Sequence, residues 1–288
     1  MFQDYETMEK RIVLPTDFSN NALNAIEYAI DLHKNQKCVF YILNAFWGDK
    51  EPTDIAPLIP ERGDVEYTSA KKFSEDGLTT LLPIVQLRSK NSKHRYHTLS
   101  SYSSLLFALK DSIAKNNIEL VVMGTKGTSD EEETLFGSNT LSIMEYITEC
   151  PILAVPGHYT FSGLKKIVFP TDYEMVFNEN KLKYILEIAK SNKSEIQILH
   201  IKKERKLDES QEKNKGILES IFKGVAYSFH VLTGIAVNKG IHSFIESETC
   251  DLVVFLDEKS NYLGNELPKF LVKEIKSHLM IPVLVINP

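Results

Sequence analysis

The chain of 288 residues contains the same pattern twice. The segment Lys10–Phe18 recurs as Lys165–Tyr173, and both carry a Pro-Thr-Asp triplet at the same place. Three further pairs follow in the same order: Tyr41–Ala45 with Gln197–Ile201, Glu119–Met123 with Asp251–Phe255, and Cys150–Val155 with Ile281–Ile286. A repeat of this length predicts two domains of one fold, which we place at residues 1–157 and 163–288.

Each copy consists of short apolar segments that alternate with helical ones. Short, predominantly apolar stretches such as 11–14, 39–43 and 118–123 are typical of strands in a parallel sheet covered on both faces. After the first of them, Ser19 precedes apolar residues at helical spacing, which predicts a helix capped by this serine. The Pro- and charge-rich stretch 47–72 is the expected loop insertion of the longer first copy. The alternation predicts two tandem, doubly wound, Rossmann-like α/β domains with parallel sheets.

A glycine pattern follows the apolar segment 118–123. Gly124–Gly127 comes directly after it, and Gly137–Thr140 opens the next helical segment. Glycine lets the main chain approach an anion closely, and the N–H groups at a helix start point towards it. The Pro15–Asp17 triplet also stands at a strand end, so both signals fall at the carboxyl edge of one sheet, where such folds bind ligands. The pattern therefore predicts a ligand that carries phosphate.

The combination of repeat, turn and glycines resembles the universal stress protein family. That family's pattern is Gly-x2-Gly-x9-Gly-Ser/Thr, and it is met here by Gly124, Gly127, Gly137 and Ser138. The Pro15–Ser19 turn and the last apolar segment of the first copy, Cys150–Val155, support the resemblance. It covers nearly the whole chain, as a tandem of two domains with the adenine-nucleotide-hydrolase-like fold. The resemblance implies ATP or another adenine nucleotide as the ligand.

The resemblance also implies which residues surround the adenine and the ribose. Asp17 would contact the adenine or ribose side, above a pocket floor shaped by Pro15 and Thr16. Ala45 would offer its backbone to the adenine edge. Two further residues would line the ribose: Met123 and Gly124.

Around the phosphates, the resemblance implies backbone N–H groups and hydroxyls as ligands. The residues concerned are Gly127, Gly137, Ser138 and Asn139, with a further hydroxyl from Thr140. We add Lys126, a cation inside the motif that could pair with a phosphate. The acidic stretch 129–134 departs from a good phosphate site, because carboxylates there would repel the ligand unless Mg²⁺ intervenes or they point into solvent.

The second copy lacks the glycine motif. Alignment of the matched segments puts Leu256 opposite Gly124, Lys259 opposite Gly127, and Pro268-Lys269 opposite Gly137-Ser138. A leucine prevents the close backbone approach that glycine permits, and a proline at a helix start removes an N–H donor. Asp172 is retained and is expected to be a turn or cap aspartate. We therefore expect only the first domain to bind nucleotide.

Composition narrows the class of protein. Apolar residues make up 43% and charged residues 25% of the chain, as in soluble globular proteins. A net charge of −6 without a basic face argues against nucleic acid as the partner. No stretch reaches the roughly 20 apolar residues of a membrane span, and no apolar leader is evident. With cysteines expected to be buried free thiols (Cys38, Cys150 and Cys250), we predict a cytoplasmic protein.

Neither a catalytic residue nor a metal site is predicted. His94 and His97 lie three apart in an expected strand or loop, where they would face opposite sides. The favoured function is a nucleotide-binding stress or regulatory protein. The alternatives are a slow ATP-hydrolysing or adenylyl-transfer enzyme and a protein-interaction scaffold that binds no nucleotide.

The family resemblance also bears on assembly. Its members commonly dimerise by pairing their last strands, which implies an antiparallel pair of 152–155 with 283–286 inside one chain. The tandem would then be an intramolecular pseudo-dimer that covers two sheet edges. A homodimer of the whole chain and an unknown protein partner remain open.

Overall fold

The computed structural model describes residues 9–47, 64–126, 136–202, 206–256 and 280–286. These residues form two compact units, with the division between Thr160 and Phe161. Each unit is described on its own below. The predicted pairing of the two final strands concerns both units together and stays a prediction.

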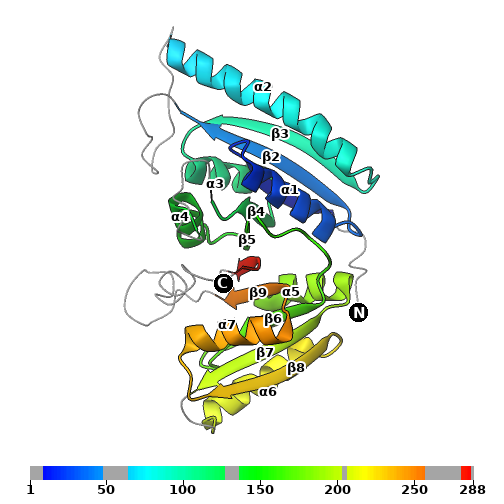
Figure 1. Cartoon of the computed structure of the whole chain (residues 1–288), viewed down its shortest axis with the longest axis vertical. Coiled ribbons are helices and arrows are strands. Elements are labelled where there is room, and N and C mark those ends of the chain that lie inside the picture. Colours follow the sequence, from blue (N-terminus) through cyan, green and yellow to red (C-terminus); the bar gives the residue numbers. More distant parts are fainter. Residues whose placement is uncertain (1–8, 48–63, 127–135, 203–205, 257–279, 287–288) are drawn as a thin grey trace. The chain divides into compact units, whose positions relative to one another are not determined.

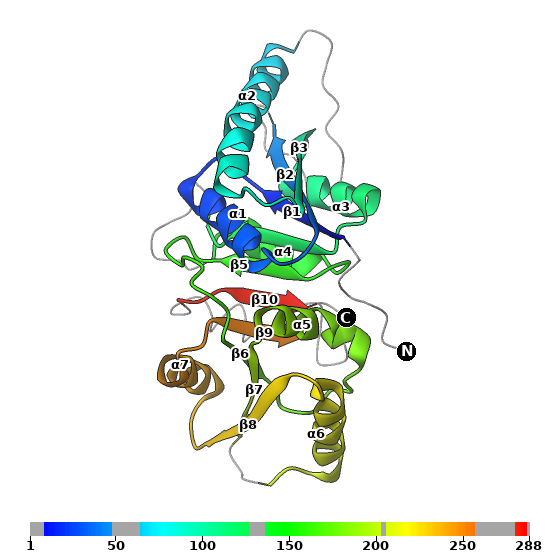
Figure 2. The same ribbon diagram turned by 90° about the vertical axis from the view of Figure 1, so that its right-hand side faces the viewer.

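The first unit is a parallel sheet with helices on both faces. Its strands, in the spatial order β3-β2-β1-β4-β5, are β1 (Lys10–Pro15), β2 (Cys38–Phe46), β3 (His94–Tyr102), β4 (Leu120–Gly124) and β5 (Ile152–Val155). Its helices are α1 (Asn20–Leu32), α2 (Val65–Arg88), α3 (Leu105–Asn116) and α4 (Ser138–Tyr146). Strands and helices alternate along the chain as predicted, and α1 and α3 lie on opposite faces of the sheet (Figures 1 and 2).

The second unit has the same winding. Its parallel strands, in the order β10-β9-β6-β7-β8, are β6 (Lys166–Pro170), β7 (Glu195–Lys202), β8 (Ala226–Thr233), β9 (Leu252–Leu256) and β10 (Val283–Ile286). The described helices are α5 (Glu179–Asn192), α6 (Glu209–Phe222) and α7 (Val237–Glu248). Two doubly wound α/β units in tandem are therefore confirmed.

The core follows the predicted apolar pattern. The interior strand β4 is buried along its whole length, which suits a strand covered on both faces. Ser19 caps α1 by accepting a hydrogen bond from the Ala22 amide, and the helix turns Ala25, Ile26 and Ala29 towards the interior. The cap predicted from the sequence is confirmed.

The predicted loop insertion 47–72 is wrong over its last eight residues, 65–72. Helix α2 begins at Val65, and Asp64 caps it by accepting from the Tyr67 amide. The sequence shows no clear amphipathic pattern here, because the helix buries Ser74 while Phe73 beside it is exposed. Apolar and polar residues therefore do not separate onto two clear faces. Residues 48–63 lie outside the described part of the chain.

Candidate functional site

The fold brings the predicted site segments of the first unit together. The chain runs from β1 outwards to β2 and β3, then returns to β4 on the other side of β1. Strand order therefore reverses between β1 and β4, which pair in parallel with Ile12 opposite Leu120. Because parallel strands end at one edge, Pro15–Asp17 and Gly124 share this switch point. Ala45 lies near the end of the neighbouring β2 and is half-buried.

The turn after β1 is held by a chain of short hydrogen bonds. The Thr16 amide donates to the Leu43 carbonyl at 2.8 Å and continues the ladder between β1 and β2. The Thr16 hydroxyl then accepts from the Phe18 amide at 3.0 Å, and Asp17 Oδ1 accepts from the Ser19 amide at 3.0 Å. Phe18 adopts a left-handed conformation with φ 65°. Asp17 is thereby exposed at the sheet edge, while Thr16 beneath it is buried.

The loop after β4 is fastened to the start of α4. The Thr140 hydroxyl donates to the carbonyls of Gly124 at 3.1 Å and Thr125 at 3.2 Å. The Gly137 amide donates to the Thr125 carbonyl at 2.7 Å, and the Thr125 amide donates to the Val155 carbonyl at 3.1 Å. The resemblance implies that Gly137 and Thr140 contact phosphate. In this structure their protons brace the loop instead, and their contact with a phosphate stays a prediction.

The start of α4 can accept an anion. Gly137 is the N-cap residue and supplies no side-chain cap, and Ser138 and Asn139 after it are exposed. The other described helices of this unit each have a side-chain cap, from Ser19, Asp64 and Ser104. Among the residues that the structure describes, no side chain caps the first-turn amides of α4, and the helix dipole favours negative charge there. The residues present fit a phosphate group.

Gly124 lies close against the backbone of helix α1. A Cβ atom at this position would lie 3.1 Å from the Asn21 carbonyl oxygen of α1. Met123 beside it has a buried side chain. Lys126 is half-buried and is the last described residue of the loop. Gly127 and the acidic stretch 129–134 lie outside the described residues.

The second unit repeats the turn geometry of the first. The Thr171 hydroxyl accepts from the Tyr173 amide at 3.0 Å, and Asp172 Oδ1 accepts from the Glu174 amide at 2.9 Å. Tyr173 has φ 62°, close to the value for Phe18. Asp172 is thus a turn aspartate, as the sequence predicts.

Helix α6 closes over this second turn. Gln211 Nε2 donates to the Asp172 carbonyl and Asn214 Nδ2 donates to the Tyr173 carbonyl, both at 2.8 Å. The side chains of Gln211, Asn214 and Tyr173 are buried. At the end of β9, Leu256 stands where the first unit has Gly124. The positions opposite Gly127, Gly137 and Ser138 lie outside the described residues.

The sequence patterns do not single out Asn44, yet it touches the candidate site. Asn44 is buried in β2, next to Ala45, and its Nδ2 donates to the Thr16 carbonyl at 2.7 Å. This bond joins the end of β2 to the turn that carries Asp17. The only sequence signal was its position in the repeat, where it aligns with His200.

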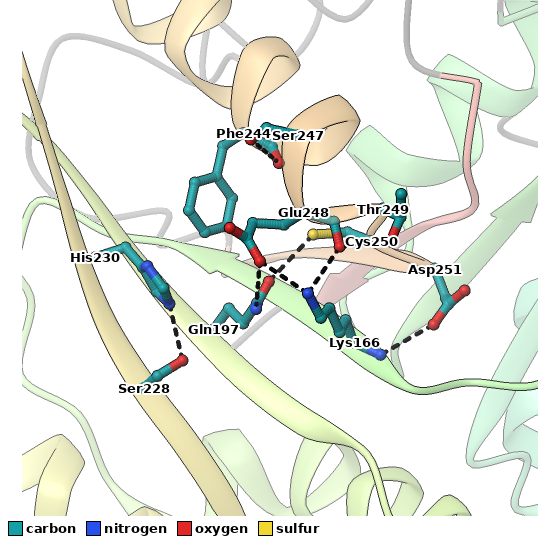
Figure 3. Close-up of polar contacts among 10 residues, drawn as sticks. All are labelled: Lys166, Gln197, Ser228, His230, Phe244, Ser247, Glu248, Thr249, Cys250 and Asp251. Carbon is teal, nitrogen blue, oxygen red and sulfur yellow. Dashed lines mark hydrogen bonds and ion pairs between the residues drawn. The ribbon is translucent and has the colours of Figure 1, made fainter.

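A polar cluster lies at the opposite edge of the second sheet, around the start of β6 (Figure 3). Lys166 Nζ is 2.8 Å from Glu248 Oε2, and Gln197 Nε2 donates to the same oxygen at 3.4 Å. The Cys250 thiol donates to Gln197 Oε1 at 3.3 Å, and burial raises the pKa of this thiol to about 12. A thiol that stays protonated is a poor nucleophile. The hydrogen bonds and the ion pair of this cluster connect β6 to the end of α7.

The remaining titratable groups offer little chemistry. All three cysteines are free and buried as predicted, and burial raises the pKa of Cys38 and Cys150 to about 12. His94 is buried and His97 exposed, which confirms that they face opposite sides of β3. Within the described residues, no cluster of histidine, cysteine and acidic side chains could hold a metal ion. None of the described helices combines the length and apolarity needed to cross a bilayer.

Known proteins share this sequence pattern and fold. The model of the universal stress protein family matches residues 8–156. Universal stress protein MJ0531 of Methanocaldococcus jannaschii is 26% identical over 152 residues, which are 52% of this chain and 84% of the relative.

Solved structures resemble the chain over almost its whole length. A universal stress protein from Archaeoglobus fulgidus matches with a TM-score of 0.70 and 16% identity, over 96% of this chain and 98% of that one. A putative universal stress protein from Pseudomonas aeruginosa matches with a TM-score of 0.59 and 10% identity, over 97% of this chain and 93% of that one. At these identities the structures show a shared fold.

Proposed function

We propose that this chain, which belongs to the universal stress protein family, is a stress-response or regulatory protein that binds ATP or another adenine nucleotide in its first unit. One observation carries the proposal. The Asp17 turn and the start of α4, which has no side-chain cap, belong to the same sheet edge, beside the point where strand order reverses. Parallel α/β folds bind their ligands at that place.

The start of α4 suits the phosphates of a nucleotide, and the turn after β1 suits its ribose and base. The amides of Ser138 and Asn139 at the start of α4 suit the phosphates, because they combine N–H donors with the positive end of the helix dipole. Asp17 is exposed at the end of β1 and supplies a carboxylate for the ribose hydroxyls or the base. We assign Pro15, Thr16 and the Ala45 backbone to the pocket floor and the adenine edge.

The second unit is proposed to bind no nucleotide. Its turn carbonyls already accept hydrogen bonds from Gln211 and Asn214 of α6. Leu256 also replaces the glycine that the first unit places against α1. The buried side chains of Gln211 and Asn214 thus hold the second turn against α6.

Binding without efficient turnover fits the described site. Asp17 is the acidic side chain assigned to the nucleotide, and it sits with the base and ribose rather than with the phosphates. Hydrolysis would need a group that activates water beside the γ-phosphate. We therefore propose regulation by the bound nucleotide rather than catalysis. Mg²⁺ would assist by neutralising phosphate charge.

The proposal can be tested by identifying the nucleotide that the protein retains. The purified chain is denatured, and the supernatant is separated by HPLC before and after incubation with ATP and Mg²⁺. We expect ATP to be recovered largely intact. Steady conversion to ADP would favour a hydrolase, and absence of any nucleotide together with no measurable ATP affinity would favour a scaffold.

A matched pair of variants tests the assignment to the first unit. Asp17→Asn keeps the Oδ1 atom that accepts from Ser19 but removes the charge, so the turn should survive. Loss of a charged hydrogen bond should weaken ATP binding by about tenfold or more. Asp172→Asn makes the same change in the second unit and should leave ATP affinity unchanged. Equal effects of the two substitutions would contradict the assignment.

A further inference from the structure

The hydrogen bond from Asn44 to the turn after β1 has a counterpart in the second unit. His200 occupies the same place in β7, and its Nδ1 lies 2.8 Å from the Thr171 carbonyl oxygen. A carbonyl can only accept, so Nδ1 carries the proton and donates. The two repeats therefore make the same bond, to the same carbonyl of the Pro-Thr-Asp triplet, with two different side chains.

The second unit makes this bond with an imidazole ring. With the proton on Nδ1, the other ring nitrogen of His200 is an acceptor, and it is buried with no hydrogen-bond partner among the described residues. Asn44 and His200 differ in size and chemistry, and what they share is an N–H donor directed at the threonine carbonyl.

The bond fixes the carbonyl that directly precedes the site aspartate. The Thr16 carbonyl belongs to the peptide that leads into Asp17, and Thr16 itself is buried. Its amide and hydroxyl are already bonded to Leu43 and Phe18, so the bond from Asn44 fixes the remaining polar group of this residue. Without a donor from β2, the peptide could rotate and carry the aspartate with it.

We infer that Asn44 is a positioning residue of the nucleotide site, which sets the orientation of Asp17 through the Thr16 carbonyl and does not itself touch the ligand. This inference rests on the proposed function. The chemical requirement is an N–H donor of the right reach, and His200 shows that an imidazole meets it. In the second unit, the hydrogen bond from His200 orders a turn that is packed against α6. There the bond affects stability alone.

Three substitutions separate positioning from general stability. Asn44→Leu removes the donor from the first unit, and His200→Leu removes it from the second. Asn44→His installs the donor that the second unit uses. ATP dissociation constants are measured by calorimetry at 25 °C, where thermal unfolding curves show each variant to be folded.

We expect both leucine variants to lower the melting temperature, but only Asn44→Leu to weaken ATP binding, by about tenfold. Asn44→His should bind ATP within about threefold of the wild type. Hydrogen exchange gives a second readout that needs no ligand. The amides of Phe18 and Ser19 should exchange faster in Asn44→Leu and at the wild-type rate in Asn44→His.

Several outcomes would overturn the inference. Wild-type affinity in a folded Asn44→Leu variant would do so, and so would an Asn44→His variant as weak as Asn44→Leu. If Asn44→Leu does not fold, Asn44→Ala takes its place with the same expectations. A wild-type chain that binds no ATP would refute the proposed function itself, whereas unchanged exchange at Phe18 and Ser19 would refute only the positioning role.

Discussion

Replacing Thr140 by valine removes one hydroxyl from the connection between the β4 loop and α4. Valine has nearly the same shape, so packing around this buried residue is preserved. The carbonyls of Gly124 and Thr125, which accept from the hydroxyl at 3.1 and 3.2 Å, lose that donor. The Thr125 carbonyl keeps the Gly137 amide as a donor, so the loss falls mainly on the Gly124 carbonyl. Leaving one buried acceptor without a donor costs on the order of 1–3 kcal/mol. We expect the free energy of unfolding to fall by about that amount, and the melting temperature by several degrees.

The serine variant is the matched control. Thr140→Ser keeps the hydroxyl but loses a methyl group, which costs on the order of 1 kcal/mol of apolar burial. Stability alone therefore does not separate the two variants well. ATP affinity should separate them, because only the hydroxyl braces the loop: we expect threonine and serine to bind alike and valine to bind several-fold more weakly.

The assay is denaturant unfolding followed by ATP titration of each folded variant. A valine variant as stable as the wild type, with wild-type affinity for ATP, would refute the role given to the hydroxyl. A serine variant that loses as much affinity as the valine variant would show that the methyl group, rather than the hydrogen bonds, shapes the loop.

Three further predictions concern stability. Burial lowers the pKa of His33 from 6.5 to about 3, so as the pH falls below 6.5 the unfolded chain takes up a proton that the folded chain refuses. Protonation of His33 should then lower the unfolding free energy by about 1.4 kcal/mol for each pH unit. His33→Asn should remove this contribution to the slope in denaturant titrations. An unchanged slope in the variant would exclude His33 as its source. Gly157→Ala would place a Cβ atom 1.7 Å from Asn21 Oδ1, so the Asn21 side chain must rotate away. Because only the end of a side chain has to move, the first unit should lose little stability, and the double variant with Asn21→Ala should be as stable as the single one; a large loss in Gly157→Ala would contradict this. Gly216→Ala, where the Cβ meets nothing within 4 Å inside α6, should instead raise stability by about 0.5–1 kcal/mol; a lower melting temperature would contradict this.

The sequence predicts the parts of the fold that depend on local pattern. Short, predominantly apolar runs mark the buried strands, Ser19 marks the start of α1, and the repeat marks two units of one winding. The switch point follows from these, since strand ends in a parallel sheet share an edge. The loop predicted over 47–72 extends too far, into helix α2, because this helix mixes apolar and polar residues on its faces, with Phe73 exposed and Ser74 buried.

The sequence does not predict hydrogen bonds between side chains and carbonyls that lie far apart along the chain. The bond from Asn44 to Thr16 spans 28 positions, and that from Asn214 to Tyr173 spans 41. No spacing rule links such residues, because which carbonyl a carboxamide reaches depends on how strands and helices pack. The same holds for Thr140, whose hydroxyl could equally face a ligand or the loop until the loop is seen.

The central claim is that one nucleotide binds per chain, in the first unit. Isothermal titration of the wild-type chain with ATP and Mg²⁺ measures this number directly. We predict a stoichiometry of one ATP per chain. Two ATP per chain, or a single ATP whose binding survives Asp17→Asn but is lost in Asp172→Asn, would contradict the account.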